Sequence, residues 1–302
     1  MSVATSPARP RLGSANLRQA YFLTLAGALG AVIGLYLYVE LIRPFGHLRQ
    51  AQNLWWARDL LAGAALGATI GFFLNASEPF RDGAWLKLAR TGTWGALAGA
   101  AGGMLGLLLG EIVLGGLQGG PVGRAVSWAI LGLGIGVSQG IAYRSRQRLI
   151  YGLIGGGLGG LVGGFLFEIL RENLGNRYDL SQALGVVILG AGLGLFLALV
   201  EQVLRRAWVQ VLRGRQEGRA YLLGRRLSSI GLNERADVGL FGDASIARQH
   251  AEIEATGAGF VLHNRDPQGR TKVNGKPVTG SEPLKDGDRI ELGRTLLVFR
   301  QR

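Results

Sequence analysis

Six apolar stretches, each near the length that crosses a bilayer, constrain this chain more than any other feature of its sequence. A transmembrane helix needs about 20 predominantly apolar residues, because the hydrocarbon core is about 30 Å thick. The stretches cover about 20–41, 60–76, 91–114, 125–142, 149–170 and 183–204. They predict an all-α polytopic membrane domain of six helices at 19–206, preceded by an N-terminal tail at 1–18.

Basic residues predict the orientation of these helices. An even number of spans places both termini on one side. That side holds eleven basic residues: Arg9, Arg11, Arg18, Arg81, Lys87, Arg90, Arg144, Arg146, Arg148, Arg205 and Arg206. The opposite side holds six: Arg43, Arg49, Arg58, Arg124, Arg171 and Arg177. The positive-inside rule therefore predicts a multi-pass protein of the plasma (inner) membrane with both termini in the cytoplasm.

Glycine, with 51 residues, forms a repeat inside the predicted membrane domain. Gly95, Gly99, Gly102, Gly103, Gly106 and Glu111 of the third span recur 57 positions later as Gly152, Gly156, Gly159, Gly160, Gly163 and Glu168. The first span follows more loosely with Gly27, Gly30 and Gly34. The even spans share Gly67 and Gly71, Gly132, Gly134 and Gly136, and Gly190, Gly192 and Gly194. The pattern predicts three Gly-rich hairpin repeats of parallel topology.

Glycines three and four residues apart lie on one helix face and let helix backbones approach closely in lipid. Three arrangements satisfy these stripes: packing within one bundle, a homo-oligomer formed through the Gly-rich helix faces, and a pore lining. We favour packing within the bundle.

Three glutamates, Glu40, Glu111 and Glu168, end the odd-numbered spans on the predicted outer side. An ionisable residue inside a membrane is a candidate functional residue, and a ring of carboxylates attracts cations. Residues at helix ends also simply reach the interface, which is the interpretation we favour.

Composition limits the other functions. A net charge of +13 suits nucleic-acid binding in a soluble protein, but here many arginines flank apolar runs. Membrane topology and anionic membrane lipid explain that charge better, so we predict no nucleic-acid partner. The chain has no Cys, and its sequence contains no phosphate-binding loop, metal-ligand cluster or kinase signature. We therefore predict no cofactor, no metal and no enzyme activity.

From residue 207 the pattern changes to short alternating strands separated by turns, for example 208–212, 219–223, 259–263 and 295–300. Such alternation predicts an all-β sandwich over 207–302. The chain is therefore expected to be a multi-domain protein.

Five groups of residues in this region resemble the forkhead-associated (FHA) domain, a β-sandwich that typically binds phosphothreonine. They are Ile230-Gly231, Asp237-Val238-Gly239-Leu240, Arg248-x-His250-Ala251-x-Ile253, Val273-Asn274-Gly275 and Gly287-Asp288-x-Ile290-x-x-Gly293. The resemblance covers about 207–302 and implies a structural role for His250, which bonds neighbouring loops in the family.

The scaffold residues also have roles predicted from their chemistry. Gly231, Gly275, Gly287 and Gly293 suit turns with positive φ, with Asp288 beside one of them. Alternation points one set of side chains inward between the sheets. The set is Val238, Leu240, Ile253, Val261, Val273, Ile290, Leu292 and Val298.

The positions that hold the phosphopeptide in the family are changed in this sequence. The resemblance implies an arginine, a serine and an asparagine where this chain has Leu232, Ala247 and Gly269. The first two changes remove a charge-assisted hydrogen bond and a hydroxyl bond to phosphate. Because a charge-assisted bond contributes roughly 1.5–3 kcal/mol, phosphothreonine binding is expected to be weakened or lost.

Polar residues near the expected loops are candidates for partner binding: Arg235, Arg248, Arg270, Thr271, Lys272 and Asn274. Three interpretations stay open: a reorganised phosphate site, phosphate-independent protein binding, and a structural or oligomerising role.

The favoured function is a membrane-anchored adaptor or scaffold that binds a cytoplasmic protein, including a phosphoprotein. The resemblance implies bacterial phosphorylation-linked signalling. The alternative is a small channel or transporter regulated by the FHA-like module, because internal repeats recur in transport proteins.

Overall fold

The computed structural model describes residues 12–42, 55–117, 120–174, 178–268 and 270–302. The chain forms two compact units, Ala20–Leu204 and a unit that contains Arg205–Arg302. The boundary lies two residues before the predicted one, and the first strand begins at Ala207.

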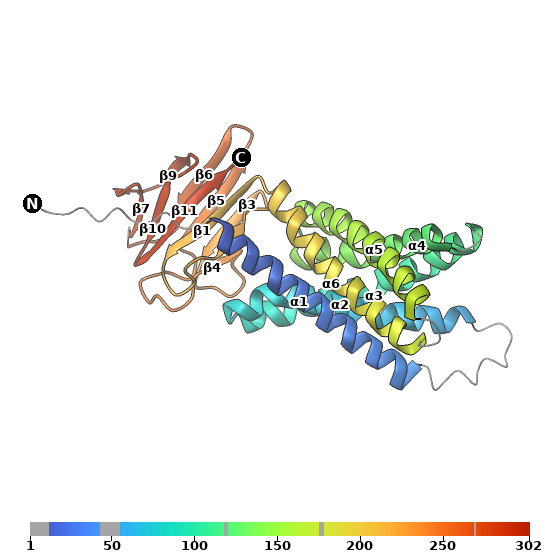
Figure 1. The fold of residues 1–302 in the computed structure, drawn as a ribbon. Coiled ribbons are helices and arrows are strands. Elements are labelled where there is room, and N and C mark those ends of the chain that lie inside the picture. Colours follow the sequence, from blue (N-terminus) through green and yellow to red (C-terminus); the bar gives the residue numbers. More distant parts are fainter. Residues whose placement is uncertain (1–11, 43–54, 118–119, 175–177, 269) are drawn as a thin grey trace, which may run out of the picture. The chain divides into compact units, whose positions relative to one another are not determined.

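The first unit is built from six long helices (Figure 1). They are α1 (Leu12–Leu37), which continues as the π-helix η1 (Tyr38–Ile42), α2 (Trp55–Asp82), α3 (Trp85–Gly116), α4 (Gly120–Tyr143), α5 (Arg146–Leu174) and α6 (Tyr178–Leu204). Each contains a stretch long and apolar enough to cross a membrane. The predicted all-α region of six helices is therefore confirmed.

Helix α2 is much longer than the predicted stretch 60–76, because it extends through Pro79 and ends at Asp82. A proline inside a helix leaves the carbonyl four residues earlier without its N–H donor. Here that carbonyl belongs to Asn75, and it accepts hydrogen bonds from the Thr91 and Tyr143 hydroxyls, both at 3.0 Å. Neighbouring helices thus satisfy the group that the proline leaves unpaired.

Ion pairs also allow α2 to continue past its apolar stretch. The Glu78 carboxylate lies 2.9 Å from the Arg148 guanidinium of α5 and 3.7 Å from the Lys87 ammonium of α3. A partly buried carboxylate such as this one is tolerated when such partners lie beside it. Apolar length alone does not reveal them, which is why the sequence underestimated this helix.

Glycines form the contacts between consecutive predicted hairpins. A Cβ built on Gly99 of α3 would lie 2.2 Å from the Gly67 carbonyl oxygen of α2, and the same contact joins Gly156 of α5 to Gly132 of α4. A Cβ on Gly27 of α1 would lie 2.0 Å from the carbonyl oxygen of Gly190 of α6. Glycine therefore lies at all three of these seams, α2 with α3, α4 with α5 and α1 with α6.

The predicted glycine stripes thus pack inside the chain. Every glycine of the stripes in the six spans lies against another segment of the same unit. Packing within the bundle accounts for these stripes. A homo-oligomer through the same helix faces stays a prediction.

The interior where α2, α4, α5 and α6 meet is filled by aliphatic side chains. Ile70, Leu74, Leu131, Ile135, Leu189 and Leu193 are each at most 4% exposed. The cavity among Leu74, Ile135, Gln139 and Leu193 has a volume of about 10 Å³, which is too small for more than a single water molecule. The described helices therefore leave no wide pore at this point.

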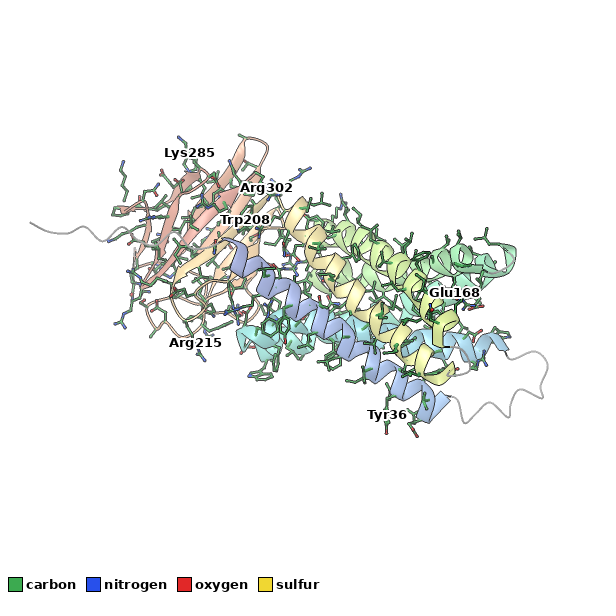
Figure 2. The ribbon with its side chains drawn as sticks, in the orientation of Figure 1. Tyr36, Glu168, Trp208, Arg215, Lys285 and Arg302 are labelled. Carbon is green, nitrogen blue, oxygen red and sulfur yellow. The ribbon has the colours of Figure 1, made fainter. Side chains whose placement is uncertain are left out.

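The three predicted outer glutamates have different environments. Glu168 on α5, labelled in Figure 2, is 3% exposed, and its carboxylate lies 2.8 Å from the Arg124 Nε of α4. The Arg124 guanidinium also lies over the Phe167 ring. Glu40 and Glu111 are exposed. Only Glu168 is held in a buried ion pair, so the three do not form equivalent members of a ring.

The second unit is a sandwich of two sheets (Figure 1). The strands are β1 (Ala207–Arg213), β2 (Ala220–Leu222), β3 (Leu227–Gly231), β4 (Val238–Gly239), β5 (Ala251–Thr256), β6 (Gly259–Asn264), β7 (Thr271–Val273), β8 (Lys276–Pro277), β9 (Ser281–Leu284), β10 (Arg289–Leu292) and β11 (Thr295–Gln301). The six-stranded sheet has the order β2-β1-β11-β10-β7-β8, and the five-stranded sheet the order β4-β3-β5-β6-β9. The predicted all-β sandwich is confirmed.

The core between the sheets includes most of the predicted inward set, but the predicted face is wrong in β6 and β11. Leu262 and Phe299 are core residues with no exposed surface, whereas Val261 is half-buried and Val298 lies outside the core cluster. Both faces of these strands carry apolar residues, so alternation cannot tell which face is inward.

Candidate protein-interaction site

Three loops of the sandwich, which include 232–237, 240–250 and 265–268, are joined by backbone hydrogen bonds. The Leu232 N–H donates to the Ala247 carbonyl at 3.1 Å, and the Asn233 N–H donates to the Arg248 carbonyl at 3.2 Å. The Arg265 N–H donates to the His250 carbonyl at 3.0 Å. The loops therefore form one connected surface, which is the candidate site.

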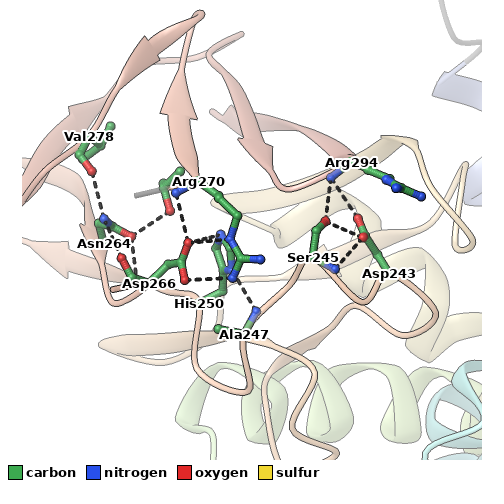
Figure 3. A network of polar contacts seen from close by, with 10 residues as sticks. Asp243, Ser245, Ala247, His250, Asn264, Asp266, Arg270, Val278 and Arg294 are labelled. Carbon is green, nitrogen blue, oxygen red and sulfur yellow. Dashed lines mark hydrogen bonds and ion pairs between the residues drawn. The ribbon is translucent and has the colours of Figure 1, made fainter. Parts of the chain in front are cut away.

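His250 lies at the centre of this connection and has no exposed surface. Its Nδ1 accepts a hydrogen bond from the Ala247 N–H at 3.0 Å (Figure 3). Its Nε2 lies 3.9 Å from the Asp266 carboxylate. Because Nδ1 is an acceptor, the proton of the neutral ring is on Nε2. The ring therefore supports the loops and is closed to solvent.

Asp266 fixes the third loop by binding Arg270 (Figure 3). Its carboxylate accepts from Arg270 Nε at 3.0 Å, from Arg270 Nη2 at 3.1 Å and from the Arg270 backbone N–H at 3.0 Å. Such a bidentate pair is strong and directional. Arg270 is therefore engaged within the loop and is a weaker candidate for partner binding than the sequence suggested.

Burial and hydrogen bonding shift the pKa values of both titratable groups. The bonds from the Arg270 side chain are the main reason that the pKa of Asp266 is lowered to about 2. Burial lowers the pKa of His250, since the charged ring would lose its hydration. Asp266 is thus ionised and His250 neutral near neutral pH.

The two described positions that replace phosphate-binding residues offer no polar side chain. Leu232 is partly buried and packs against the sandwich core. Ala247 contributes its backbone N–H to His250 and its carbonyl to Leu232. The third position, Gly269, lies outside the described residues.

Arg235 and Arg248 are the exposed candidates on the joined loops. Within the described ranges, neither guanidinium takes part in a hydrogen bond or an ion pair. The Arg235 backbone N–H donates to the Asn233 Oδ1 at 2.9 Å, which orders the loop that carries it. Two charged side chains therefore stand on an ordered backbone.

Three other candidates do not belong to this surface. Thr271 is fully buried, and its hydroxyl donates to Asn264 Oδ1 at 2.7 Å. Asn274, with φ of 51°, bonds through its side chain to Asp288 Oδ1 and to the Arg289 N–H. Lys272 is exposed, but it lies on β7 opposite Glu291 of β10. The side chains of Thr271 and Asn274 therefore stabilise the fold of the module.

The scaffold glycines divide into two kinds. Gly275, Gly287 and Gly293 have positive φ, as predicted. Gly231 does not; it lies in β3, where an added Cβ would be 2.3 Å from the Arg248 carbonyl oxygen. The predicted positive φ of Gly231 is wrong, and close approach of two backbones is the reason for a glycine there.

Sequence reasoning missed Asp266 as the residue that orders the third loop. One local signal was present. Asn264 and Asp266 stand at the end of β6, and the Asp266 N–H donates to the Asn264 Oδ1 at 3.0 Å. Such a side-chain turn at a strand end indicates an ordered loop, but its pairing with Arg270 depends on the fold.

Comparisons with known proteins match the C-terminal module of this chain. Residues 210–302 match the family model Yop-YscD_cpl, described as the cytoplasmic domain of an inner-membrane component of the type III secretion system (T3SS). No curated protein sequence matches the chain.

Several solved structures are similar to the module. One, from a study of phosphothreonine-dependent FHA domain interactions, is 31% identical, covers 32% of this chain and 97% of its own, with a TM-score of 0.30. The FHA domain of CT664 from Chlamydia trachomatis is 24% identical over 32% of this chain and 98% of its own, with a TM-score of 0.30. The cytoplasmic domain of PscD from P. aeruginosa is 18% identical over 32% and 80%, with a TM-score of 0.30. The C-terminal third of this chain is thus similar to solved FHA domains, and its family match is to the cytoplasmic domain of an inner-membrane component.

Proposed function

We propose that this protein is a membrane-anchored interaction protein, in which the FHA-like module binds a cytoplasmic protein partner. The observation that carries the proposal is the set of joined loops with the exposed arginines Arg235 and Arg248. Binding residues are commonly placed on loops that a rigid scaffold positions. The six helices would hold the module at the inner membrane, as the family match and the excess of basic residues on one side support.

Phosphate-independent binding is the form of this function that the site supports best. An apolar Leu232 and a small Ala247 replace two phosphate-binding residues, and Asp266 engages the guanidinium of Arg270. Arg235 and Arg248 supply exposed positive charge on these loops. A role in phosphorylation-linked signalling is part of the proposal and depends on which proteins bind.

A direct test uses the full chain in phosphatidylcholine nanodiscs with a degenerate phosphothreonine peptide library and its unphosphorylated twin. We expect similar affinity for the two libraries. Arg248→Ala and Arg235→Ala should each weaken binding, because each removes one exposed cation from the loops. Lys276→Ala on β8 is the matched control, since it removes an exposed cation from another part of the module.

Two results would contradict the proposal. Unchanged affinity in both loop variants would place binding elsewhere on the module. A strong preference for the phosphorylated library, lost in Arg248→Ala, would show instead that a phosphate site has been rebuilt from other residues.

A further inference from the structure

Three turns of the module line a polar cleft whose lining includes neither Arg235 nor Arg248. Its volume is about 280 Å³, and it is lined by Gly214, Arg215, Gly242, Asp243, Ala244, Arg294 and Thr295. Gly214 follows β1, and Arg294 lies between β10 and β11. Asp243 and Ala244 belong to the same 240–250 loop that carries Arg248, so the cleft adjoins the candidate site.

Asp243 holds the cleft together. Its Oδ2 accepts from the Arg294 N–H at 2.9 Å and from the Thr295 hydroxyl at 3.2 Å. Its Oδ1 accepts from the Ser245 N–H at 3.0 Å and also from the Ser245 hydroxyl. Four donors thus bind this one carboxylate, and they tie the loop to the turn between β10 and β11.

Two arginines line this cleft, and a third lies beside one of them. Figure 3 shows the Arg294 side chain extending away from Asp243, while its backbone N–H faces the carboxylate. Arg215, labelled in Figure 2, lies against Gly242, where an added Cβ would be 2.7 Å from the Arg215 Cδ. Arg213 donates from Nε to the Arg294 carbonyl at 3.2 Å. All three arginines are exposed.

The local charge is positive. Two arginines, Arg215 and Arg294, line the cleft with one carboxylate, Asp243, which already accepts four hydrogen bonds from the module. In the parts of the chain that the structure describes, the guanidinium groups of Arg215 and Arg294 form no hydrogen bond or ion pair. Their planar donor arrays match the oxygens of a carboxylate or phosphate.

We propose that this cleft binds an acidic side chain of a protein partner, with Arg215 and Arg294 as its ligands. Its volume is just below the usual range for small-molecule pockets of about 300–1,000 Å³, so one or two side chains fit better than a nucleotide. No aromatic side chain lines it to stack on a base. The inference shares with the proposed function only the premise that the partner is a protein.

The test measures binding of a degenerate peptide pool rich in Asp and Glu, and of the matched Asn and Gln pool, to the full chain in phosphatidylcholine nanodiscs. We expect the acidic pool to bind more tightly, and the preference to fall about 10- to 100-fold in Arg215→Ala or Arg294→Ala, as the loss of a charge-assisted bond implies. Lys276→Ala is the control. Arg294→Ala keeps the Arg294 backbone N–H that donates to Asp243, and Arg215→Ala does not affect that bond.

A second variant tests the cleft without changing its charge. Ala244→Leu places a larger side chain at an exposed position in the lining. We expect it to reduce binding of the acidic pool while the thermal unfolding of the module stays unchanged. Unaltered binding in this variant would contradict the cleft as the binding place.

The possible results separate this inference from the proposed function. No preference for the acidic pool would overturn it. A preference lost in Arg235→Ala and Arg248→Ala but kept in Arg215→Ala and Arg294→Ala would overturn it and leave the proposed function standing. A preference kept in Arg235→Ala and Arg248→Ala but lost in Arg215→Ala and Arg294→Ala would support the cleft and contradict the loop arginines as the binding residues. Binding to phosphatidylglycerol vesicles through Arg215 and Arg294, without binding to the acidic pool, would show a lipid ligand and also overturn it.

Discussion

The two units of this protein are packed by opposite means. The buried face of α3 consists mainly of glycines, among them Gly95, Gly99, Gly103 and Gly106, and backbone meets backbone across its seam with α2. The sandwich instead buries large side chains such as Ile290, Leu297 and Phe299. In lipid, apolar burial gives helices no reason to associate, so close van der Waals contact matters most. In water, removal of large apolar side chains from solvent stabilises the fold.

The largest effect expected from this comparison is in the sandwich. Phe299→Ala should lower the free energy of unfolding of the module by about 3–5 kcal/mol, because it leaves a cavity in the core. Phe299 has no exposed surface. Pulse proteolysis of the full chain in urea would measure this loss. The helices should keep their stability, and a matching loss there would show that the two units unfold together.

The opposite change, from a glycine to a larger residue, should lower the stability of the helical unit. Gly99→Ala would place a Cβ 2.2 Å from the Gly67 carbonyl oxygen, and overpacking of this kind costs about 1–3 kcal/mol. Thermal unfolding in detergent would measure it.

Gly116→Ala is the matched control, because no atom of the described residues lies within 4 Å of its added Cβ. We expect a change of no more than about 0.5 kcal/mol there. Equal effects at both glycines would mean that helix propensity, not close packing, explains the glycine-rich sequence.

Acid should destabilise the module through two groups. The pKa of Asp266 is about 2 in the folded state, below its usual value, so its stabilising effect is complete above about pH 4 and is lost as the pH falls to 2. The total loss is about 2 kcal/mol. The lowered pKa of His250 adds an earlier decline below about pH 6.5, since the unfolded chain takes up that proton first.

Urea unfolding of the full chain, measured from pH 8 to pH 2, would follow both steps. Asp266→Asn should remove the step below pH 4 and leave the earlier one. Persistence of the lower step in that variant would assign it to other carboxylates.

The smallest expected effect concerns the proline in α2. Tyr143→Phe removes one of the two hydroxyls that bond to the Asn75 carbonyl, and it should cost about 1 kcal/mol in detergent unfolding. Thr91 still donates to that carbonyl, which limits the loss. In Pro79→Ala the carbonyl regains its own helical donor, so Tyr143→Phe should then cost less. An equal cost in both backgrounds would contradict this account of the proline.

Much of the candidate site was predictable as a set of loops, but the role of each side chain was not. The sequence placed Arg235 and Arg248 among the candidates, and both are exposed. It also grouped Thr271, Asn274 and Arg270 with them, whereas Thr271 is buried and Asn274 bonds to Asp288. Residue type and position in the chain do not reveal which polar groups satisfy one another. Only the folded arrangement brings Asp266 to Arg270.

The sequence by itself determined the two-part architecture of this protein. Apolar length, glycine spacing and strand alternation depend on local periodicity, and each unit must bury the face that this periodicity creates. The tertiary structure alone decided the rest: the length of α2 past Pro79, the buried pair of Glu168 with Arg124, the inward face of β11 and the cleft beside Arg215. Each depends on a partner far away in the chain, because a buried polar group or a crowded backbone is stable only when a distant segment completes its contacts.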